Sequence, residues 1–266
     1  VFKIKDDYYF GLNFKMKKGW KTYWKNPGDA GLPLSIEVLE DDSKFKTEIL
    51  FPFPSRFFDE GILTIGYENE VLFPVKIISK NLREIVTTIK IDYLVCKDIC
   101  IPISEKKKIN LNLENIQSSN YFEEYYKTVP KKDNTNFSIT KRENIDKKSL
   151  KFEIKTNDDF EIKDIFLFSS ESTLTLEKNE KINNNFNIIK SEKNLSELSQ
   201  PILISLSDGK DSFEIPFDIK KRSKANSYVW FYLLAFIGGM ILNFMPCVLP
   251  VLSLKLLTFS SLIKSQ

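Results

Sequence analysis

Alternating apolar and polar residues run through much of the chain before residue 220. Residues 10–16 alternate Phe, Leu and Met with Gly, Asn and Lys, and residues 85–96 place Ile, Tyr and Val on one face. Residues 109–113 alternate Ile and Leu with Asn, as a returning strand would. A period of two residues is typical of half-buried β-strands. Residues 26–33 contain two Pro and two Gly and are expected to form turns. The pattern predicts a β-sandwich for the first part of the chain.

A second strand-rich stretch follows a short helical segment. Ser119 is a candidate N-cap for a helix that runs to Tyr126 and ends before Pro130. Residues 150–154 alternate again, and Asp208-Gly209 between two apolar runs is typical of a hairpin. We therefore expect an all-β chain with two domains in tandem. The expected boundaries are 1–114 for the first domain, 115–134 for a linker with a short helix, and 135–222 for the second domain.

The character of the sequence changes at Ser227. No charged residue occurs from there to Leu254, which is long enough to cross a hydrocarbon core of about 30 Å. A buried core helix is the alternative, but such helices seldom run this long without a polar face. We predict a transmembrane α-helix within residues 227–263. Pro246 and Pro250 interrupt it, and backbone breaks at membrane depth occur where protein or a wet cavity surrounds them, although a lipid-facing kink is also possible.

Composition removes several classes of function. The 266 residues include no His, and the net charge is only +3 with 42% hydrophobic and 28% charged residues. Without His, a Ser-His-Asp or Cys-His mechanism is excluded within this chain. A small net charge with interspersed signs does not favour nucleic-acid binding. Three Met and no Met-rich tract argue against direct copper storage.

Two of the three cysteines, Cys96 and Cys100, fall at the connection between two predicted strands. As a structural bridge they would close a ring of about five residues, which contributes only about 2 kcal/mol against nearly 5 for a loop of 100. As a zinc site they lack two further ligands. As a redox pair they are well spaced, because one sulfur can resolve the mixed disulfide that the other forms. We expect no metal and no cofactor.

The third cysteine, Cys247, stands between the two prolines of the apolar stretch. A single thiol cannot carry a dithiol–disulfide couple, and a passive buried Cys is the simpler interpretation. If Cys247 is active, its partner lies on another segment, so the redox hypothesis predicts that the chain belongs to a longer membrane protein. The absence of Met and of an apolar leader at Val1 is consistent with a removed export signal.

At these residues the sequence resembles the DsbD-like membrane protein-disulfide reductases, especially the branch of suppressor of copper sensitivity proteins. Four stretches carry the resemblance: 19–33 GWKTYWKNPGDAGLP, 65–75 IGYENEVLFPV, 93–102 YLVCKDICIP and 238–250 GGMILNFMPCVLP. Residues 115–220 are similar only in general character. The resemblance implies immunoglobulin-like β-sandwiches in the first part of the chain and a transmembrane helix at its end.

The resemblance also implies a function. The family passes electrons from cytoplasmic thioredoxin through a membrane cysteine pair to periplasmic proteins that contain disulfides. Cys247 matches the first member of the membrane pair, while Cys96 and Cys100 match the reactive pair of the N-terminal domain. By position Cys100 would be the attacking sulfur and Cys96 the resolving one. The expected setting is the bacterial inner membrane, with lipid around the helix and the β domains in the periplasm.

Three departures and one conflict accompany the resemblance. The better-known branch spaces the reactive pair more widely and shields it with an aromatic cap, but residues 59–62 carry no aromatic at the matching position, although Phe57 and Phe58 precede them. The second membrane cysteine and a thioredoxin-like domain are absent from the 266 residues. Basic residues at 220–224 would favour a cytoplasmic location by the positive-inside rule, but large exported domains translocate regardless of such charges.

Two functions from different classes therefore remain. The first is a protein-disulfide reductase that uses Cys96, Cys100 and Cys247. The alternative is a membrane-anchored scaffold of β-sandwiches in which Cys96 and Cys100 only brace a loop. A link to copper would run through the repair of copper-oxidised thiols.

Overall fold

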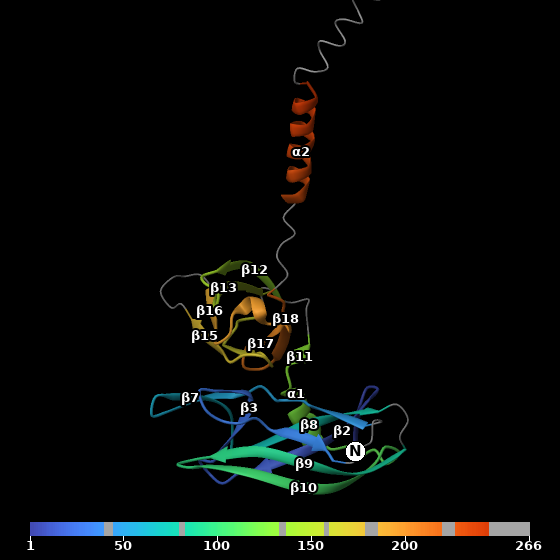
Figure 1. The fold of residues 1–266 in the computed structure, drawn as a ribbon. Coiled ribbons are helices and arrows are strands. Elements are labelled where there is room, and N and C mark those ends of the chain that lie inside the picture. Colours follow the sequence, from blue (N-terminus) through green and yellow to red (C-terminus); the bar gives the residue numbers. More distant parts are fainter. Residues whose placement is uncertain are drawn as a thin grey trace, which may run out of the picture. The chain divides into compact units, whose positions relative to one another are not determined.

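The structure is a computed structural model and describes residues 1–39, 45–79, 83–132, 137–156, 160–178, 186–219 and 227–244. The chain forms two compact units, Val1–Ile219 and Lys220–Gln266. The first unit contains all the described strands (Figure 1).

Two sheets form the first sandwich. One has the strand order β1-β2-β8-β5, and the other has the order β10-β9-β3-β7-β6 with β4 also paired to β9. Their strands are β1 (Phe2–Ile4), β2 (Asp7–Lys15), β3 (Lys21–Gly28), β4 (Ser35–Val38), β5 (Phe45–Ile49), β6 (Ser55–Asp59), β7 (Ile62–Glu68), β8 (Glu70–Ser79), β9 (Glu84–Cys96) and β10 (Cys100–Asn112).

Alternation along the strands supplies the core of this sandwich. Trp24 of β3 and Ile89 of β9 are fully buried from one sheet, and Phe73 of β8 is fully buried from the other. These side chains belong to one apolar cluster that joins both sheets. Along β9 the odd-numbered positions point inward, as residues 85–96 predicted, so the even-numbered positions, including Cys96, lie on the outer face.

Two further sheets follow, with the orders β11-β18-β17-β14 and β12-β13-β16-β15. Between them lies a second apolar cluster that includes fully buried Phe152, Ile204 and Phe217. The elements are β11 (Lys131–Lys132), β12 (Phe137–Asn144), β13 (Ser149–Thr156), β14 (Asp164–Phe168), β15 (Leu174–Lys178), β16 (Phe186–Ser191), the 3-10 helix η1 (Leu195–Glu197), β17 (Ile202–Ser207) and β18 (Ser212–Phe217). The hairpin predicted at Asp208-Gly209 joins β17 to β18, and Gly209 has the positive φ that the turn requires.

The segment between the two pairs of sheets contacts both. Helix α1 (Asn120–Lys127) begins after Ser119, as predicted, and its Phe122 is buried against Phe2 and Tyr9 of the first sandwich. β11 pairs in parallel with β18 of the last sheets. The domain boundaries expected from the sequence stay a prediction, because one compact unit includes all four sheets.

We expect Ser119→Ala to lower the free energy of unfolding by about 1 kcal/mol, since the Ser119 Oγ accepts the Phe122 N–H at the first turn of α1. Urea denaturation of the two proteins measures the difference. The exposed neighbour Ser118 is the matched control, and its replacement by Ala should change stability by less than about 0.5 kcal/mol. Equal effects at both positions would contradict the capping role.

The all-β, immunoglobulin-like prediction is confirmed by these sheets. One local prediction is wrong: residues 26–28 were expected to form a turn but continue β3, whose register against β7 shifts between Tyr23 and Gly28. Gly28 has a φ of +87°, and a Cβ there would lie 2.5 Å from the Leu63 carbonyl oxygen. Gly28 therefore allows an irregular strand to pass close to β7.

The second unit contains helix α2 (Ser227–Phe244). Its described large apolar side chains are exposed, among them Tyr232, Phe236 and Met240. Within the described ranges, no helix combines the length and the apolar character needed to cross a membrane. The predicted spanning segment at 227–263 is described only to Phe244, so Cys247 and both of its flanking prolines lie outside the described residues.

Candidate redox site

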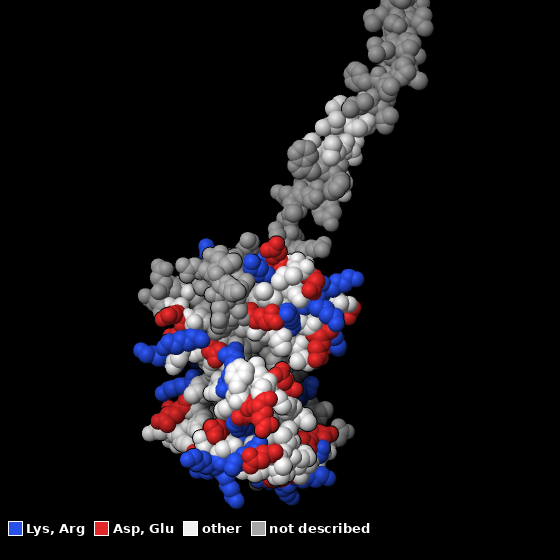
Figure 2. Space-filling view, turned by 90° about the vertical axis from the view of Figure 1, so that its left-hand side faces the viewer, with Lys and Arg blue, Asp and Glu red and all other residues white. Residues whose placement is uncertain are grey.

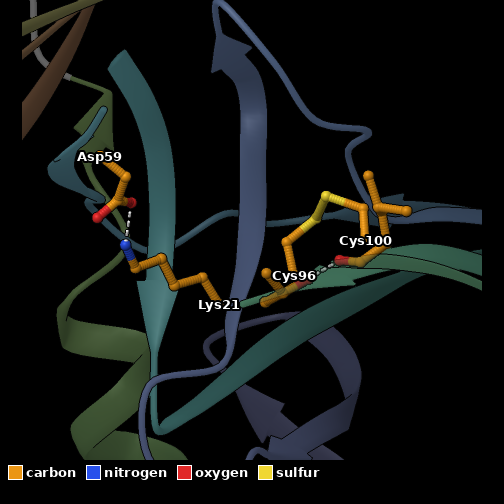
Figure 3. The surroundings of a disulfide bond; sticks show 6 residues. Lys21, Asp59, Cys96 and Cys100 are labelled. Carbon is orange, nitrogen blue, oxygen red and sulfur yellow. Dashed lines mark hydrogen bonds and ion pairs between the residues drawn. A yellow bond between two sulfur atoms is a disulfide. The ribbon is translucent and has the colours of Figure 1, made fainter. Parts of the chain in front are cut away.

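Cys96 and Cys100 lie at the tip of a long hairpin. β9 and β10 pair along their whole lengths, and the last residues in register are Cys96 and Cys100. The three residues 97–99 form the turn, in which the Lys97 N–H donates to the Ile99 carbonyl at 3.1 Å. The two sulfur atoms form a disulfide, with the Cα atoms 4.1 Å apart (Figure 3). The structure thus brings the two predicted residues together at the connection between two strands.

The two sulfur-bearing residues differ in exposure. Cys96 is only 6% exposed because its strand has neighbours on both sides, β10 and β3. Cys100 is exposed, because β10 is the edge strand of its sheet. Ile99 and Ile101 beside it are exposed as well. A reactant in solution therefore meets Cys100 first.

A lysine lies on the other side of the buried cysteine. Lys21 of β3 is in register with Cys96, so the two side chains share the outer face of the sheet. The Lys21 ammonium forms an ion pair with Asp59 (Figure 3). It also lies 4.5 Å from the centre of the Phe57 ring. Lys21 is largely buried, with 17% of its side chain exposed, whereas 66% of the Asp59 side chain is exposed. No local pattern predicts this pair, because Lys21 and Asp59 are 38 positions apart in the chain.

The hairpin between β6 and β7 positions Asp59. Glu60 and Gly61 both have positive φ, 51° and 86°, as a two-residue turn of type I′ requires. Asp59 pairs with Ile62 across this turn and is the last residue of β6. Of the two aromatic residues before it, Phe57 contacts Lys21 while Phe58 is exposed.

The charges of the cysteine turn itself are more exposed. Lys97 and Asp98 lie 4.0 Å apart, with 48% and 89% of their side chains exposed. The Lys97 side chain passes close to Gly19, where a Cβ would lie 3.3 Å from it. Gly19 also has a φ of +83°, so this position suits glycine twice. Solvent weakens the effect of charges as exposed as these.

Tyr23, two residues after Lys21, does not supply a base. Burial raises the pKa of its phenol, and the Asp59 carboxylate raises it further. The phenol is therefore neutral at physiological pH. On the inner side of the hairpin, burial and Glu105 raise the pKa of Tyr93 to about 12.

A groove lies beside the hairpin, between β2 and the pair β9 and β10. Its volume is about 630 Å³, and its lining includes Phe14, Met16, Trp20, Tyr93 and Ile101. Ile101 is in register with Val95 on the inner face of the hairpin, whereas Cys100 is in register with Cys96 on the outer face, so the groove and the disulfide lie on opposite faces. Among the described residues, no group of three or more His, Cys, Asp and Glu is arranged to hold a metal ion.

Residues 2–112 match the family described as thiol:disulfide interchange protein DsbD, N-terminal. These residues form a DsbD-like N-terminal region. The crystal structure of the N-terminal periplasmic domain of ScsB from Proteus mirabilis is similar to this chain, with a TM-score of 0.56 and 19% sequence identity. The likeness covers 81% of this chain and 88% of that one. No match was found among the curated proteins.

The DsbD-like region contains both Cys96 and Cys100, together with Lys21 and Asp59. Three of the four motif stretches, 19–33, 65–75 and 93–102, also fall inside it. The fourth, 238–250, falls outside it. The structural likeness covers more of the chain than residues 2–112 alone provide, so the shared fold extends into the second pair of sheets.

Proposed function

We propose that this chain is the redox-active front part of a protein-disulfide reductase that works by thiol–disulfide exchange at Cys96 and Cys100. The disulfide at the hairpin tip carries the proposal, since it pairs one exposed sulfur-bearing residue with one buried residue. The exposed member can meet a partner, and the buried member stays within reach to resolve the mixed disulfide. A DsbD-like region around the pair supports the same chemistry.

Reduction of the site needs a donor dithiol. A donor thiolate attacks the Cys100 sulfur, the Cys96–Cys100 bond breaks, and its electron pair leaves on Cys96 as a thiolate. The second thiol of the donor then attacks the donor sulfur that is bonded to Cys100, and Cys100 leaves with the electron pair of that bond. The donor becomes a disulfide. Cys100 takes the proton that the second donor thiol gives up, Cys96 takes a proton from water, and the two cysteines are then a dithiol. Run in reverse against a protein disulfide, the same steps reduce the substrate.

The finer parts of the proposal concern location and partners. The similar structure is described as a periplasmic domain, and we propose the periplasm for the β unit of this chain. The donor would be a membrane cysteine pair that includes Cys247 and is fed by cytoplasmic thioredoxin, and the acceptors would be periplasmic thiol–disulfide proteins. The uncharged stretch from Ser227 to Leu254 and the exposed apolar side chains of α2 support an inner-membrane setting.

We expect Cys96 and Cys100 to switch together between dithiol and disulfide. After treatment with dithiothreitol, labelling with a thiol reagent and mass spectrometry should find both cysteines modified. After oxidation, neither should be modified. A bridge that survives millimolar dithiothreitol in the folded protein would refute the reductase and leave a structural brace. Replacement of both cysteines by Ser would then leave partner binding unchanged.

A further inference from the structure

We propose that Lys21 is the cation that stabilises the Cys96 thiolate when the disulfide opens, by exchanging Asp59 for the sulfur as its partner. This inference rests on the proposed reductase function. It adds a residue from β3 that is 75 positions from Cys96 in the sequence. The proposal is based on the pairing of Lys21 with Cys96 in neighbouring strands.

The geometry places the lysine within reach. Directly opposed residues of antiparallel strands have Cβ atoms about 4.5–5.5 Å apart. Lys21 and Cys96 are such a pair, and Cys100 is opposed to Cys96 on the next strand. The four-carbon side chain of Lys21 can therefore turn its ammonium from the hairpin tip to the sulfur without a backbone change.

In the oxidised protein no negative charge on sulfur attracts the Lys21 ammonium. A disulfide carries no charge, and Figure 3 shows the Lys21 side chain extending toward Asp59 rather than toward the two sulfur atoms. Breaking the bond changes this balance. The leaving electron pair creates a negative charge on Cys96, which is 6% exposed and therefore poorly solvated by water.

The exchange of partners favours the sulfur. Asp59 is mostly exposed, so water solvates its carboxylate after the lysine leaves, and exposed ion pairs contribute little. The Cys96 thiolate has little access to water and gains more from a nearby ammonium. Phe57, on which the ammonium rests, belongs to the same hairpin as Asp59, so the lysine leaves both contacts together.

The other charged groups around the pair do not replace Lys21. Glu68 of β7 is opposed to Lys21 on its other side and is exposed. Lys97 is more exposed than Lys21, passes along Gly19 and lies beside Asp98. Asp59, Glu68 and Asp98 are all negative and oppose a thiolate. Lys21 is the least exposed cation among these groups.

Two measurements test the proposal. The first is the rate at which dithiothreitol reduces the Cys96–Cys100 disulfide at pH 7. The second is the pH profile of iodoacetamide alkylation of Cys96 in a Cys100→Ser background, which needs no disulfide. We expect Lys21→Met to slow reduction about tenfold, as loss of one favourable charge near a buried thiolate does, and to move the alkylation profile to higher pH.

Three further variants sharpen the result. Lys21→Arg keeps the positive charge and should be reduced at most of the wild-type rate. It tests the charge even if Lys21→Met also lowers the stability of the fold. Asp59→Asn frees the lysine and should speed reduction. Lys97→Met, the matched loss of an exposed charge, should change the rate less than about twofold. If the Lys21–Asp59 pair were only structural, Lys21→Met and Asp59→Asn would shift the rates in the same direction.

The outcomes separate the two proposals. A wild-type disulfide that resists dithiothreitol overturns the reductase, and the alkylation profile still tests Lys21. If the wild-type disulfide is reduced, two results overturn the role of Lys21 alone. One is a Lys21→Met protein that is reduced as fast as the wild type, and the other is a Lys97→Met protein that is reduced as slowly as Lys21→Met. The role of Lys21 would also be overturned if Lys21→Met and Lys21→Arg changed the reduction rate and the alkylation profile equally.

Discussion

Replacing Cys100 by Ser should abolish thiol–disulfide exchange completely, whereas Cys96→Ser should leave a protein that becomes trapped as a mixed disulfide. The reason is the difference in exposure: Cys100 lies on an edge strand in contact with solvent, and Cys96 is 6% exposed. The exposed sulfur is the one that a disulfide partner as large as glutathione or a protein can reach, whereas Cys96 is open only to a small reagent such as iodoacetamide. Without Cys96, no second thiol resolves the mixed disulfide. Incubating each reduced variant, in a Cys247→Ser background, with oxidised glutathione and measuring intact mass without reductant should find one glutathione on Cys96→Ser and none on Cys100→Ser.

Both variants should remain folded, so the comparison is interpretable. The bridge closes a very short ring and joins residues already paired in register, and its loss should cost no more than about 2 kcal/mol. Thermal unfolding of the two variants, which lack the same bond, provides the control. Glutathione on Cys100→Ser at the same rate as on Cys96→Ser would show that exposure does not decide which sulfur attacks.

The cysteine hairpin could be predicted because local pattern determines it. Inward positions of β9 alternate with outward ones from Ile85 to Ile91, and this period is visible in the sequence. The returning strand and the short connection then place Cys96 opposite Cys100. Ser119 and Asp208-Gly209 were equally readable, since caps and hairpin turns act over only a few residues.

The surroundings of the disulfide were not predictable in this way. Lys21 and Asp59 meet only because β3 and β7 pair and the β6–β7 turn then presents Asp59. No local preference encodes such a contact. The turn predicted at residues 26–28 was wrong for a related reason. Pro and Gly usually mark turns, but here the pairing of β3 with β7 overrides that preference.

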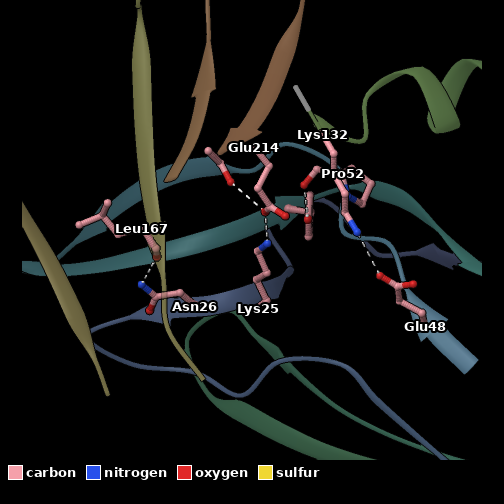
Figure 4. Close-up of polar contacts among 9 residues, drawn as sticks. Lys25, Asn26, Glu48, Pro52, Lys132, Leu167 and Glu214 are labelled. Carbon is pink, nitrogen blue, oxygen red and sulfur yellow. Dashed lines mark hydrogen bonds and ion pairs between the residues drawn. The ribbon is translucent and has the colours of Figure 1, made fainter. Parts of the chain in front are cut away.

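The same strand also connects the first sandwich to the second pair of sheets. Beyond Lys21, β3 presents Trp24 to Phe166, with ring centres 5.7 Å apart, and Asn26 donates to the Leu167 carbonyl at 2.7 Å (Figure 4). Arg56 of β6 pairs with Asp164 of β14. The second sandwich therefore packs against β3, the strand that positions Lys21, and so supports the surroundings of the disulfide.

In the view of Figure 2, charges of both signs are interspersed over the described surface.

Glu214→Gln should destabilise this connection by about 3 kcal/mol, the second large effect we expect. Glu214 of β18 forms an ion pair with Lys25 of β3 and accepts a hydrogen bond from Ser205 (Figure 4). Both members of the pair are largely buried, so the change leaves a lysine charge without its counter-ion. Urea denaturation measures the loss. The exposed pair of Lys190 and Glu177 provides the control, and Glu177→Gln should cost less than about 1 kcal/mol.

The pH dependence identifies the cause of that loss. Burial lowers the pKa of Lys25, and Glu214 opposes this shift most strongly; the Lys132 charge lowers the pKa a little further, and Glu48 raises it a little. Glu214→Gln removes the main opposition and should lower the pKa further. A lysine whose pKa is lower in the folded protein than in the unfolded chain destabilises the fold below its folded pKa, and that penalty is relieved as pH rises toward the unfolded value of about 10.4. The deficit of Glu214→Gln relative to wild type should therefore shrink between neutral pH and pH ~10, while that of Glu177→Gln stays small throughout. A deficit independent of pH would mean that lost packing, rather than an unpaired Lys25, weakens the contact between the two sandwiches.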